Sequence, residues 1–387
     1  MRELHMRRTN LIVPTYTGDV SGACSALFEL GGMVVIHDPS GCNSTYNTHD
    51  ETRWYDQDSL IFITGLVERD AILGNDDKLV ADVVDAAREL SPRFIALCNS
   101  PIPFISGTDF AAICRLVERA CHIPCFYVRT NAMHDYVVGA GNAFEQVARR
   151  FVDEAPVRAG TLNILGATPL DLGVAGSDAT LRAFAEDAGF EVVSCWAMGS
   201  TLDELARAAE AEVNLVVSAT GLKVAQYLRE RFGTPYVTGL PVGAFAERLA
   251  GDLRRAARDG QCLWPHRDAR AQRGRAPWAL VGEPIATGSL ASAVERELGV
   301  DARVLCPLEA HAELIGAADA LVEGEEGVAE ALRGAEVVVA DELYRPIVGE
   351  GTRLVALPHQ ALSGRNGWKS AQDPTRVDVR ALLAGQA

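Results

Sequence analysis

The sequence has no apolar run of about 18 residues, the length that a membrane-spanning helix needs. Its charged start, residues 1–8, is not followed by the apolar stretch of a secretory signal. Aromatic residues make up only 6% of the 387 residues, which suits packed strand–helix units better than an all-β sandwich. Acidic residues outnumber basic ones by 52 to 36, and the net charge of −16 argues against nucleic acid or an anionic membrane as the main partner.

Two nucleotide-binding signatures are also missing or incomplete. No Walker A motif (G-x-x-x-x-G-K-[ST]) occurs, so we expect the chain itself not to bind or hydrolyse ATP. Gly139-Ala-Gly141 is only part of a dinucleotide fingerprint, because it has no third glycine and follows no predicted strand. We interpret this segment as a structural turn.

Nine cysteines are present, an odd number in a chain long enough to build its own hydrophobic core. Such a chain does not need disulfides, and we expect reduced thiols in a cytoplasmic protein. Four of the nine fit helix or strand patterns and are expected to be small buried apolar residues: Cys114, Cys121, Cys125 and Cys306.

Short β-branched runs alternate with helical patterns along the whole chain, which predicts an α/β protein built of parallel sheets with right-handed crossovers. We predict three Rossmann-like domains: residues 1–157, residues 158–275, and a smaller third domain with a C-terminal tail at residues 276–387. Strands are predicted at residues 33–36, 60–64, 94–97 and 125–128, then at 162–165, 192–196, 215–217 and 236–237, and finally at 279–281, 303–306, 337–340 and 354–357. We expect a ligand pocket where the domains meet.

Three cysteines of the first domain stand apart from the others. Cys42 follows the predicted strand 33–36 inside a Pro/Ser/Gly loop, and Cys98 ends the predicted strand 94–97. Cys24 is predicted in the first turn of a helix at 25–30, where unpaired backbone N–H groups favour the thiolate. Because ligands collect at the carboxyl ends of parallel strands, the three could hold an iron–sulfur cluster. Burial as small apolar residues is the alternative that the residues alone leave open.

Several polar residues are candidates for contact with a substrate or cofactor. His49 and Arg53 follow Cys42 and could protonate a substrate or steer an anionic group. His359 follows the predicted strand 354–357 and could face a pocket between domains, with Ser363 and Arg365 nearby. A structural histidine is the alternative interpretation of His359.

Segments in order along most of the chain resemble the nitrogenase component 1 family, which includes the MoFe protein subunits, their cofactor-assembly scaffolds and the tetrapyrrole reductases. Asp38-Pro-Ser-Gly-Cys42 is similar to the His-Gly-Pro-x-Gly-Cys segment of that family. Further similar segments are Leu73-Gly-Asn-Asp-Asp-Lys-Leu79, residues 91–98 followed by 104–109, residues 211–218 followed by 228–236, and Ala361-Leu-Ser-Gly-Arg365.

The resemblance implies roles for particular residues. Cys24, Cys42 and Cys98 fall where the family places ligands of its subunit-interface iron–sulfur cluster, either [4Fe-4S] or P-cluster-like. Ser218 occupies the position where the catalytic subunit of nitrogenase carries the cysteine that holds its large metal cofactor. A serine hydroxyl is a poor replacement for a thiolate on such a centre, so dinitrogen is not the expected substrate.

The function implied is the catalytic component of a nitrogenase-like reductase. Low-potential electrons would come from a separate ATP-dependent iron–sulfur reductase and pass through the interface cluster to a substrate that the sequence does not identify. Three cysteines do not complete a four-thiolate set, so we expect a homodimer or a heterodimer with a related component 1 subunit. A non-catalytic scaffold for assembly of a metal cofactor is the alternative, and a binding protein without a cluster is a third interpretation.

Overall fold

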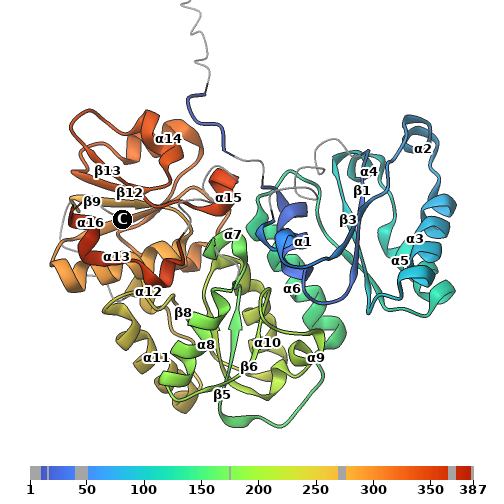
Figure 1. Ribbon diagram of the computed structural model, residues 1–387, viewed down its shortest axis with the longest axis horizontal. Helices are drawn as coiled ribbons and strands as arrows, with labels where there is room; N and C mark the ends of the chain where they lie inside the picture. Colours follow the sequence, from blue (N-terminus) through green and yellow to red (C-terminus); the bar gives the residue numbers. More distant parts are fainter. Residues whose placement is uncertain are drawn as a thin grey trace, which may run out of the picture.

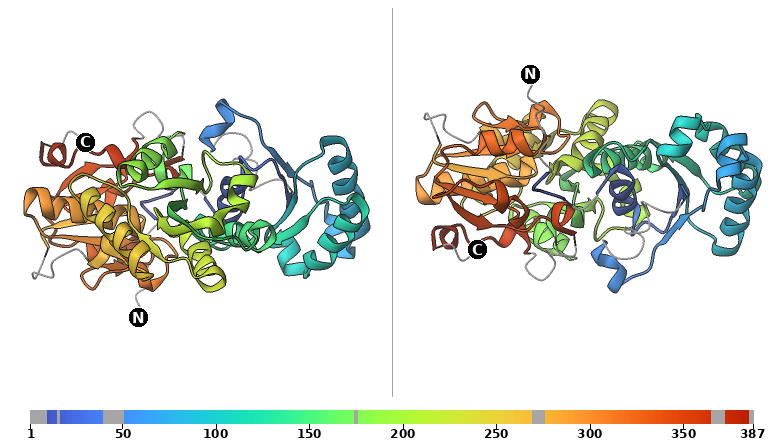
Figure 2. Two further views of the ribbon diagram at one scale, coloured as in Figure 1. Left: turned by 90° about the horizontal axis from the view of Figure 1, so that it is seen from below. Right: turned by 90° about the horizontal axis from the view of Figure 1, so that it is seen from above.

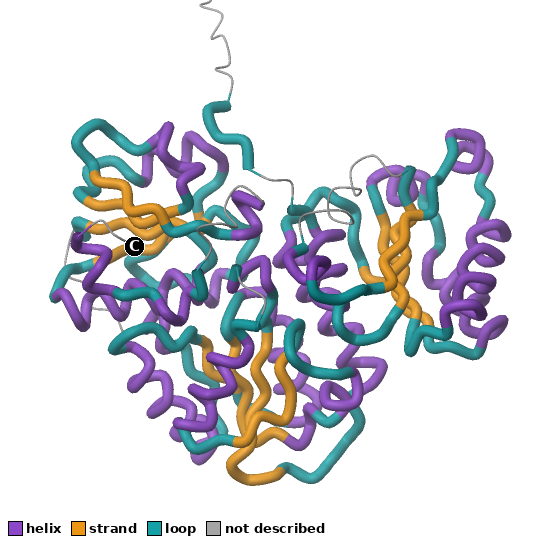
Figure 3. Tube along the Cα trace, viewed as in Figure 1, coloured by secondary structure: helices purple, strands orange, loops and turns teal. Residues whose placement is uncertain are grey.

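The computed structural model describes residues 10–14, 17–39, 51–173, 176–268, 276–364 and 372–384. Their strands form three separate parallel sheets, which lie in three lobes of the molecule (Figure 1). Figure 3 shows the three groups of strands, each flanked by helices, and Figure 2 shows the first lobe at one end of the molecule. Among the described residues, no helix combines the length and apolar character that crossing a bilayer requires.

The first sheet has the order β2-β1-β3-β4, with all strands parallel. Alternate residues of β1 enter different cores: Met33 and Val35 face the core under α3 and α5, whereas Val34 and Ile36 belong to the core with α1 and α6. Both faces are therefore apolar, as expected for a parallel sheet covered by helices on each side. The elements of this lobe are α1 (Asp19–Leu27), β1 (Met33–His37), β2 (Leu60–Ile63), α2 (Glu68–Leu73), α3 (Asp76–Leu90), β3 (Ile95–Asn99), α4 (Pro101–Ser106), α5 (Phe110–Cys121), β4 (Cys125–Val128) and α6 (Tyr136–Phe151).

The second sheet has the order β6-β5-β7-β8 and is again wholly parallel. Its elements are β5 (Arg158–Leu165), α7 (Pro169–Leu172), α8 (Asp178–Asp187), β6 (Glu191–Cys195), α9 (Leu202–Ala206), β7 (Ala211–Val216), α10 (Leu222–Phe232), β8 (Tyr236–Thr238) and α11 (Phe245–Asp259). The short helix α7 follows the carboxyl end of β5 and points toward the junction of the three lobes (Figure 1).

The third sheet has five parallel strands in the order β11-β10-β9-β12-β13. Its elements are α12 (Pro265–Asp268), β9 (Trp278–Val281), α13 (Pro284–Leu298), β10 (Ala302–Cys306), β11 (Ala320–Leu321), α14 (Gly324–Ala331), β12 (Val337–Ala340), β13 (Arg353–Ala356), α15 (Gln360–Ser363) and α16 (Val379–Ala384). The three sheets confirm the predicted α/β class with Rossmann-like parallel architecture.

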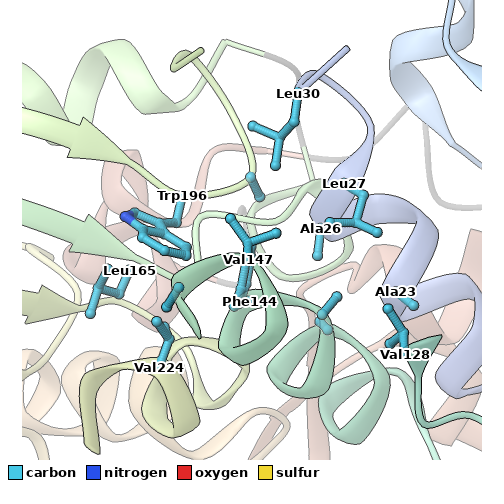
Figure 4. Close-up of a cluster of buried hydrophobic side chains, with 14 of the residues drawn as sticks. Ala23, Ala26, Leu27, Leu30, Val128, Phe144, Val147, Leu165, Trp196 and Val224 are labelled. Atoms are coloured by element: carbon cyan, nitrogen blue, oxygen red, sulfur yellow. The ribbon is translucent and has the colours of Figure 1, made fainter. Parts of the chain in front are cut away.

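Helix α6 joins the first lobe to the second through one continuous core. Side chains of α1, α6 and the second sheet meet there, as Figure 4 shows for Ala26, Leu27, Phe144, Leu165 and Trp196. Backbones of α1 and α6 approach each other closely, because Cβ atoms added at Gly22 and Gly139 would overlap with carbonyl oxygens of the facing helix. The prediction of a turn at 139–141 is therefore wrong: these glycines lie inside α6, and Gly139 is required for close packing.

Two further sequence predictions need correction. The helix containing Cys24 runs from Asp19 to Leu27 rather than over 25–30, so Cys24 lies in its middle and not in its first turn. The pattern of residues 201–211 likewise predicts one helix, but the helix ends at Ala206 and β7 begins at Ala211. In contrast, β4 has the predicted bounds, and α10 spans residues 222–232, where the sequence pattern also predicts a helix.

Candidate functional site

Two of the three singled-out thiols come together beneath the first sheet. Cys98 lies in β3 opposite Ile36 of β1, and α1, which carries Cys24, packs against both strands. Both thiols are fully buried in one core, and Cys98 is near enough to contribute to the raised pKa of Cys24. Burial, and then the negative charges of neighbours, raise the pKa of the Cys24 and Cys98 thiols well above the usual range. Without a metal, both are therefore protonated.

The raised pKa of Cys24 corrects the expectation of a thiolate favoured by a helix N-terminus. That effect falls off within the first turn, and Cys24 lies beyond it. A positive metal centre would reverse the balance, since a coordinating thiol is deprotonated by the ion that it binds.

Cys42 and His49 lie outside the described residues, but the chain on either side of them is placed beside the thiol pair. On one side, Ile36 is the register partner of Cys98. On the other, Glu51 Oε2 accepts a 2.9 Å hydrogen bond from the hydroxyl of Ser25, the residue after Cys24.

The polar groups after Cys98 fit an iron–sulfur cluster in part. The buried Ser100 hydroxyl and Asn99 Oδ1 have no hydrogen-bond partner among the residues that the structure describes. A hydroxyl donor beside thiolate ligands is the kind of group that tunes such a centre. The two described thiols do not form a complete ligand set, since no cluster of three or more His, Cys, Asp or Glu side chains suited to a metal ion occurs in the described ranges.

Arg53 is fully buried and engaged by protein groups on all sides. Its guanidinium donates to both carboxylate oxygens of Glu51, at 2.8 and 2.9 Å, and to the backbone carbonyls of Ser25 and Ala197. It also pairs with Glu29 at 3.1 Å. These bonds tie the segment after Cys42 to α1 and to the second lobe, which favours a positioning role for Arg53 over contact with a substrate.

His359 lies where the three lobes meet, beside a buried aspartate that the sequence did not single out. Its Nε2 is 3.6 Å from Asp171 Oδ1, and the same oxygen accepts a 2.6 Å hydrogen bond from the hydroxyl of Tyr136. Asp171 Oδ2 accepts from the hydroxyl of Thr168 at 2.9 Å. Both ring nitrogens of His359 are buried and have no hydrogen-bond partner within the described part of the chain. They are therefore available to a ligand.

A second buried carboxyl faces the same cavity. Glu283 lies at the N-terminus of α13, where its oxygens accept hydrogen bonds from the backbone N–H groups of Ala219, Ile285 and Ala286 at 2.7–3.1 Å. Burial, and next the charge of Asp171, raise the pKa of Glu283 to about 8 in spite of these three donors. Asp171, Glu283 and His359 line a cavity of about 50 Å³, and most of the other residues that line it are apolar.

The remaining predicted site residues are placed as follows. Ser218 is buried, and its hydroxyl donates to the carbonyl of Gly166 at 2.8 Å. Ser363 donates to the carboxylate of Asp341 at 2.6 Å, and that carboxylate also accepts the backbone N–H of His359 at 2.7 Å. Ser363 thus helps to hold the segment that carries His359. Arg365 lies outside the described residues.

Tyr136, Asp171 and Glu283 are the functional residues that sequence reasoning missed. Each comes from a different lobe, so no spacing in the sequence connects them. The one local signal is at Glu283-Pro284, an acidic residue followed by proline at the start of a helical pattern, which predicts a helix N-cap but no chemistry.

A family model described as nitrogenase component 1 type oxidoreductase matches residues 19–326, the greater part of the chain. The chain belongs to this family. This confirms the family predicted from the sequence segments. Component 1 of nitrogenase is also represented among solved structures with the same fold: one described as "Nitrogenase Cp1 at pH 6.5" superimposes with a TM-score of 0.70 over 98% of this chain and 94% of that chain, at 15% identity.

Curated relatives of this component 1-type chain differ in function: one takes part in cofactor biosynthesis and another is a reductase subunit. The nitrogenase iron-molybdenum cofactor biosynthesis protein NifE of Clostridium pasteurianum is 25% identical over 248 residues, 57% of this chain and 51% of the relative. One subunit of the light-independent protochlorophyllide reductase of Nostoc punctiforme is 25% identical over 224 residues, 54% of this chain and 43% of the relative. The chain spans about half the length of the curated relatives that it matches.

An exposed apolar surface lies on the first lobe, on the side of α2 and α4, which contact each other (Figure 1). We call it the α2/α4 patch, and its most exposed members are Leu73 and Ile105, both at 76%. Helix α4 begins three residues after Cys98. The patch comprises Val67, Ile72, Leu73, Ile102, Phe104 and Ile105. Exposed apolar residues gathered on two neighbouring helices are typical of protein–protein interfaces.

Proposed function

We propose that this protein is the catalytic component of a nitrogenase-like reductase, acting on a substrate other than dinitrogen. It would receive low-potential electrons from an ATP-dependent iron–sulfur reductase and pass them through an interface iron–sulfur cluster, [4Fe-4S] or P-cluster-like. The observation that carries the proposal is the convergence of Cys24 and Cys98, from separate elements, in one core. Family membership and the reductase among the relatives support it.

Cys24, Cys42 and Cys98 would hold the cluster in this proposal. A bound iron–sulfur cluster supplies reversible one-electron storage at low potential. Cys24 and Cys98 would each lose a proton on binding iron, and their complete burial keeps water away from the sulfur atoms. Arg53 and Glu51 hold the chain after Cys42 against α1 next to Cys24.

The missing fourth thiolate would come from a second component 1-type chain bound at the α2/α4 patch. Continuity supports this choice, since β3 carries Cys98 and leads within three residues into α4 and its exposed apolar side chains. The partner would be another copy in a homodimer or a related subunit in a heterodimer.

The substrate would bind at the junction of the lobes, next to His359. Ser218 does not offer the soft ligand that a large metal cofactor needs, and its hydroxyl already donates to Gly166. This supports a substrate reduced directly in the cavity rather than on a second metal centre.

A scaffold for assembly of a metal cofactor is the second candidate. The similarity to NifE over more than half of the chain supports it. A scaffold would bind a cofactor and release it to an acceptor protein without net reduction of a substrate, whereas a reductase would turn over.

The test begins with anaerobic purification of the full chain, followed by iron and sulfide analysis and visible absorption. We expect iron–sulfur absorption in the wild type and its loss in Cys24→Ser and Cys98→Ser. Cys195→Ser is the matched control, since Cys195 is equally buried but lies in the second sheet. Wild-type protein without iron, or cysteine variants that keep their full iron content, would refute the cluster. ATP-dependent turnover with the partner reductase then separates enzyme from scaffold.

A further inference from the structure

Four largely buried titratable side chains gather at the junction of the three lobes. Tyr136 comes from α6 of the first lobe, Asp171 from α7 of the second, and Glu283 and His359 from the third. Asp171 and Glu283 are at most 6% exposed, and Tyr136 is 1% exposed. We call these four residues the junction cluster.

In the part of the chain that the structure describes, the two carboxyls of the junction cluster have few positively charged groups near them. Among the described residues, no lysine or arginine lines the cavity, and His359 is the nearest group that can carry a positive charge. Two ionised carboxylates in one buried space repel each other, and the least costly way to relieve this is to bind a proton.

The groups that face Glu283 act in the same direction. Asp171 is the nearest acid, Tyr136 and Cys306 feel the charge of Glu283, and all of them are buried. The backbone donors at the start of α13 oppose this effect but do not cancel it, so the pKa of Glu283 lies at about 8.

Asp171 connects two other members of the junction cluster. Asp171 is hydrogen-bonded to Tyr136 and lies 3.6 Å from His359 Nε2. Both nitrogens of that ring lack a hydrogen-bond partner among the described residues, and His359 is one of the residues that line the cavity. A histidine whose ring nitrogens make no hydrogen bond can accept a proton at one nitrogen and donate one at the other.

We propose that the junction cluster donates protons to an uncharged or basic unsaturated group of the substrate, with Glu283 holding one of these protons at neutral pH. This rests on the proposed reductase function. Reduction of a double bond X=Y to HX–YH consumes two electrons and two protons. The partner reductase supplies the electrons, His359 and Glu283 donate the protons, and water restores them. An anionic group is disfavoured, because it would face two buried carboxyls and no lysine or arginine among the described residues lines the cavity.

The first experiment locates the proton by infrared spectroscopy of the full chain without metal, from about pH 6 to about pH 10. We expect a carbonyl band of a protonated carboxyl that disappears with a midpoint at about pH 8 and is absent in Glu283→Gln. In Asp171→Asn, the midpoint should fall by about one pH unit or more, because the negative neighbour is gone. Glu342→Gln is the control, since Glu342 is half-exposed and paired with Arg345. A band that survives in Glu283→Gln, or no band in the wild type, would overturn the proposal.

The second experiment tests the ligand class with two probes of similar size, imidazole and acetate. We expect imidazole at about pH 8 to bind about tenfold more tightly than acetate, and to shift the Glu283 band. Equal or tighter binding of acetate would refute the proposed preference. Both experiments should give the same results in Cys24→Ser, so a failure here is distinguishable from a failure of the electron-transfer function.

Discussion

The backbone of Gly139 in α6 lies directly against the carbonyl group of Asp19 in α1. The contact is reciprocated at Gly22, which faces the carbonyl of Tyr136. The pair of glycines therefore brings together the helix that carries Cys24 and the helix that begins with Tyr136. One close helix crossing positions both the thiol pair and the junction cluster.

Gly139→Ala should destabilise the protein, because the added methyl group has no space between the two backbones. We expect a loss of about 1–3 kcal/mol in the free energy of unfolding, measured by urea denaturation. Gly141→Ala in the same helix is the control: its nearest neighbour would be 3.5 Å away, which is ordinary contact. Because alanine favours a helix over glycine, that variant should be neutral or slightly more stable. Equal effects of the two substitutions would contradict the close crossing.

Arg53→Leu should be strongly destabilising because it leaves the carboxylate of Glu51 buried without its partner. We expect a loss of about 3–5 kcal/mol in urea unfolding at neutral pH. The double variant Arg53→Leu/Glu51→Leu should recover much of this loss, since no unpaired charge remains between these two positions. A double variant as unstable as the single one would show that the ion pair is not the cause.

Acid should weaken the same pair. Burial alone would raise the pKa of Glu51, but the charge and hydrogen bonds of Arg53 outweigh it, and the net pKa is lowered from 4.5. The folded state therefore gains stability from this group above pH 4.5 and loses it as the pH falls through the lowered value. In the double variant this part of the acid sensitivity should be absent.

The sequence predicted the parts of the protein that depend on local patterns. A short run of apolar and aromatic residues predicted the bounds of β4. The rule that ligands collect at strand ends placed Cys98 and the segment after β1 at one edge. The placement of Cys24 failed because nothing in the local pattern reveals the close contact at Gly22. Helix α11 was not among the predicted helices. Its apolar residues repeat at positions 245, 249, 253 and 256, however, so the sequence contains the pattern that predicts it.

The junction cluster could not be predicted in this way. Tyr136, Asp171 and Glu283 are single polar residues in three lobes, and their significance arises only from the tertiary structure. Burial and a charged neighbour, not residue type or spacing, make Glu283 different from the other glutamates.

Charges in the α2/α4 patch should weaken association with the second chain. Ile105→Glu and Leu73→Glu would each bury an unpaired carboxylate in place of an apolar side chain, and we expect the dissociation constant to rise about tenfold or more. Sedimentation velocity over a range of concentrations measures this. Val157→Glu is the control. Val157 is also an exposed apolar residue, at 57%, but it belongs to the segment that connects α6 to β5 and not to α2 or α4. Dimerisation that is unaffected by either patch variant would assign the interface to another surface.

The stability of the protein should depend on pH through Glu283. Its ordinary pKa is 4.5 and its pKa in the folded protein is about 8, so between these values the folded state keeps a proton that the unfolded state has lost. The free energy of unfolding should therefore fall as the pH rises through this window, by up to about 1.4 kcal/mol per pH unit, and level off above pH 8. Glu283→Gln cannot ionise and should lack this slope, whereas Glu342→Gln should keep it. Urea unfolding at a series of pH values measures the three slopes, and parallel curves for wild type and Glu283→Gln would show that the folded protein holds no proton at Glu283.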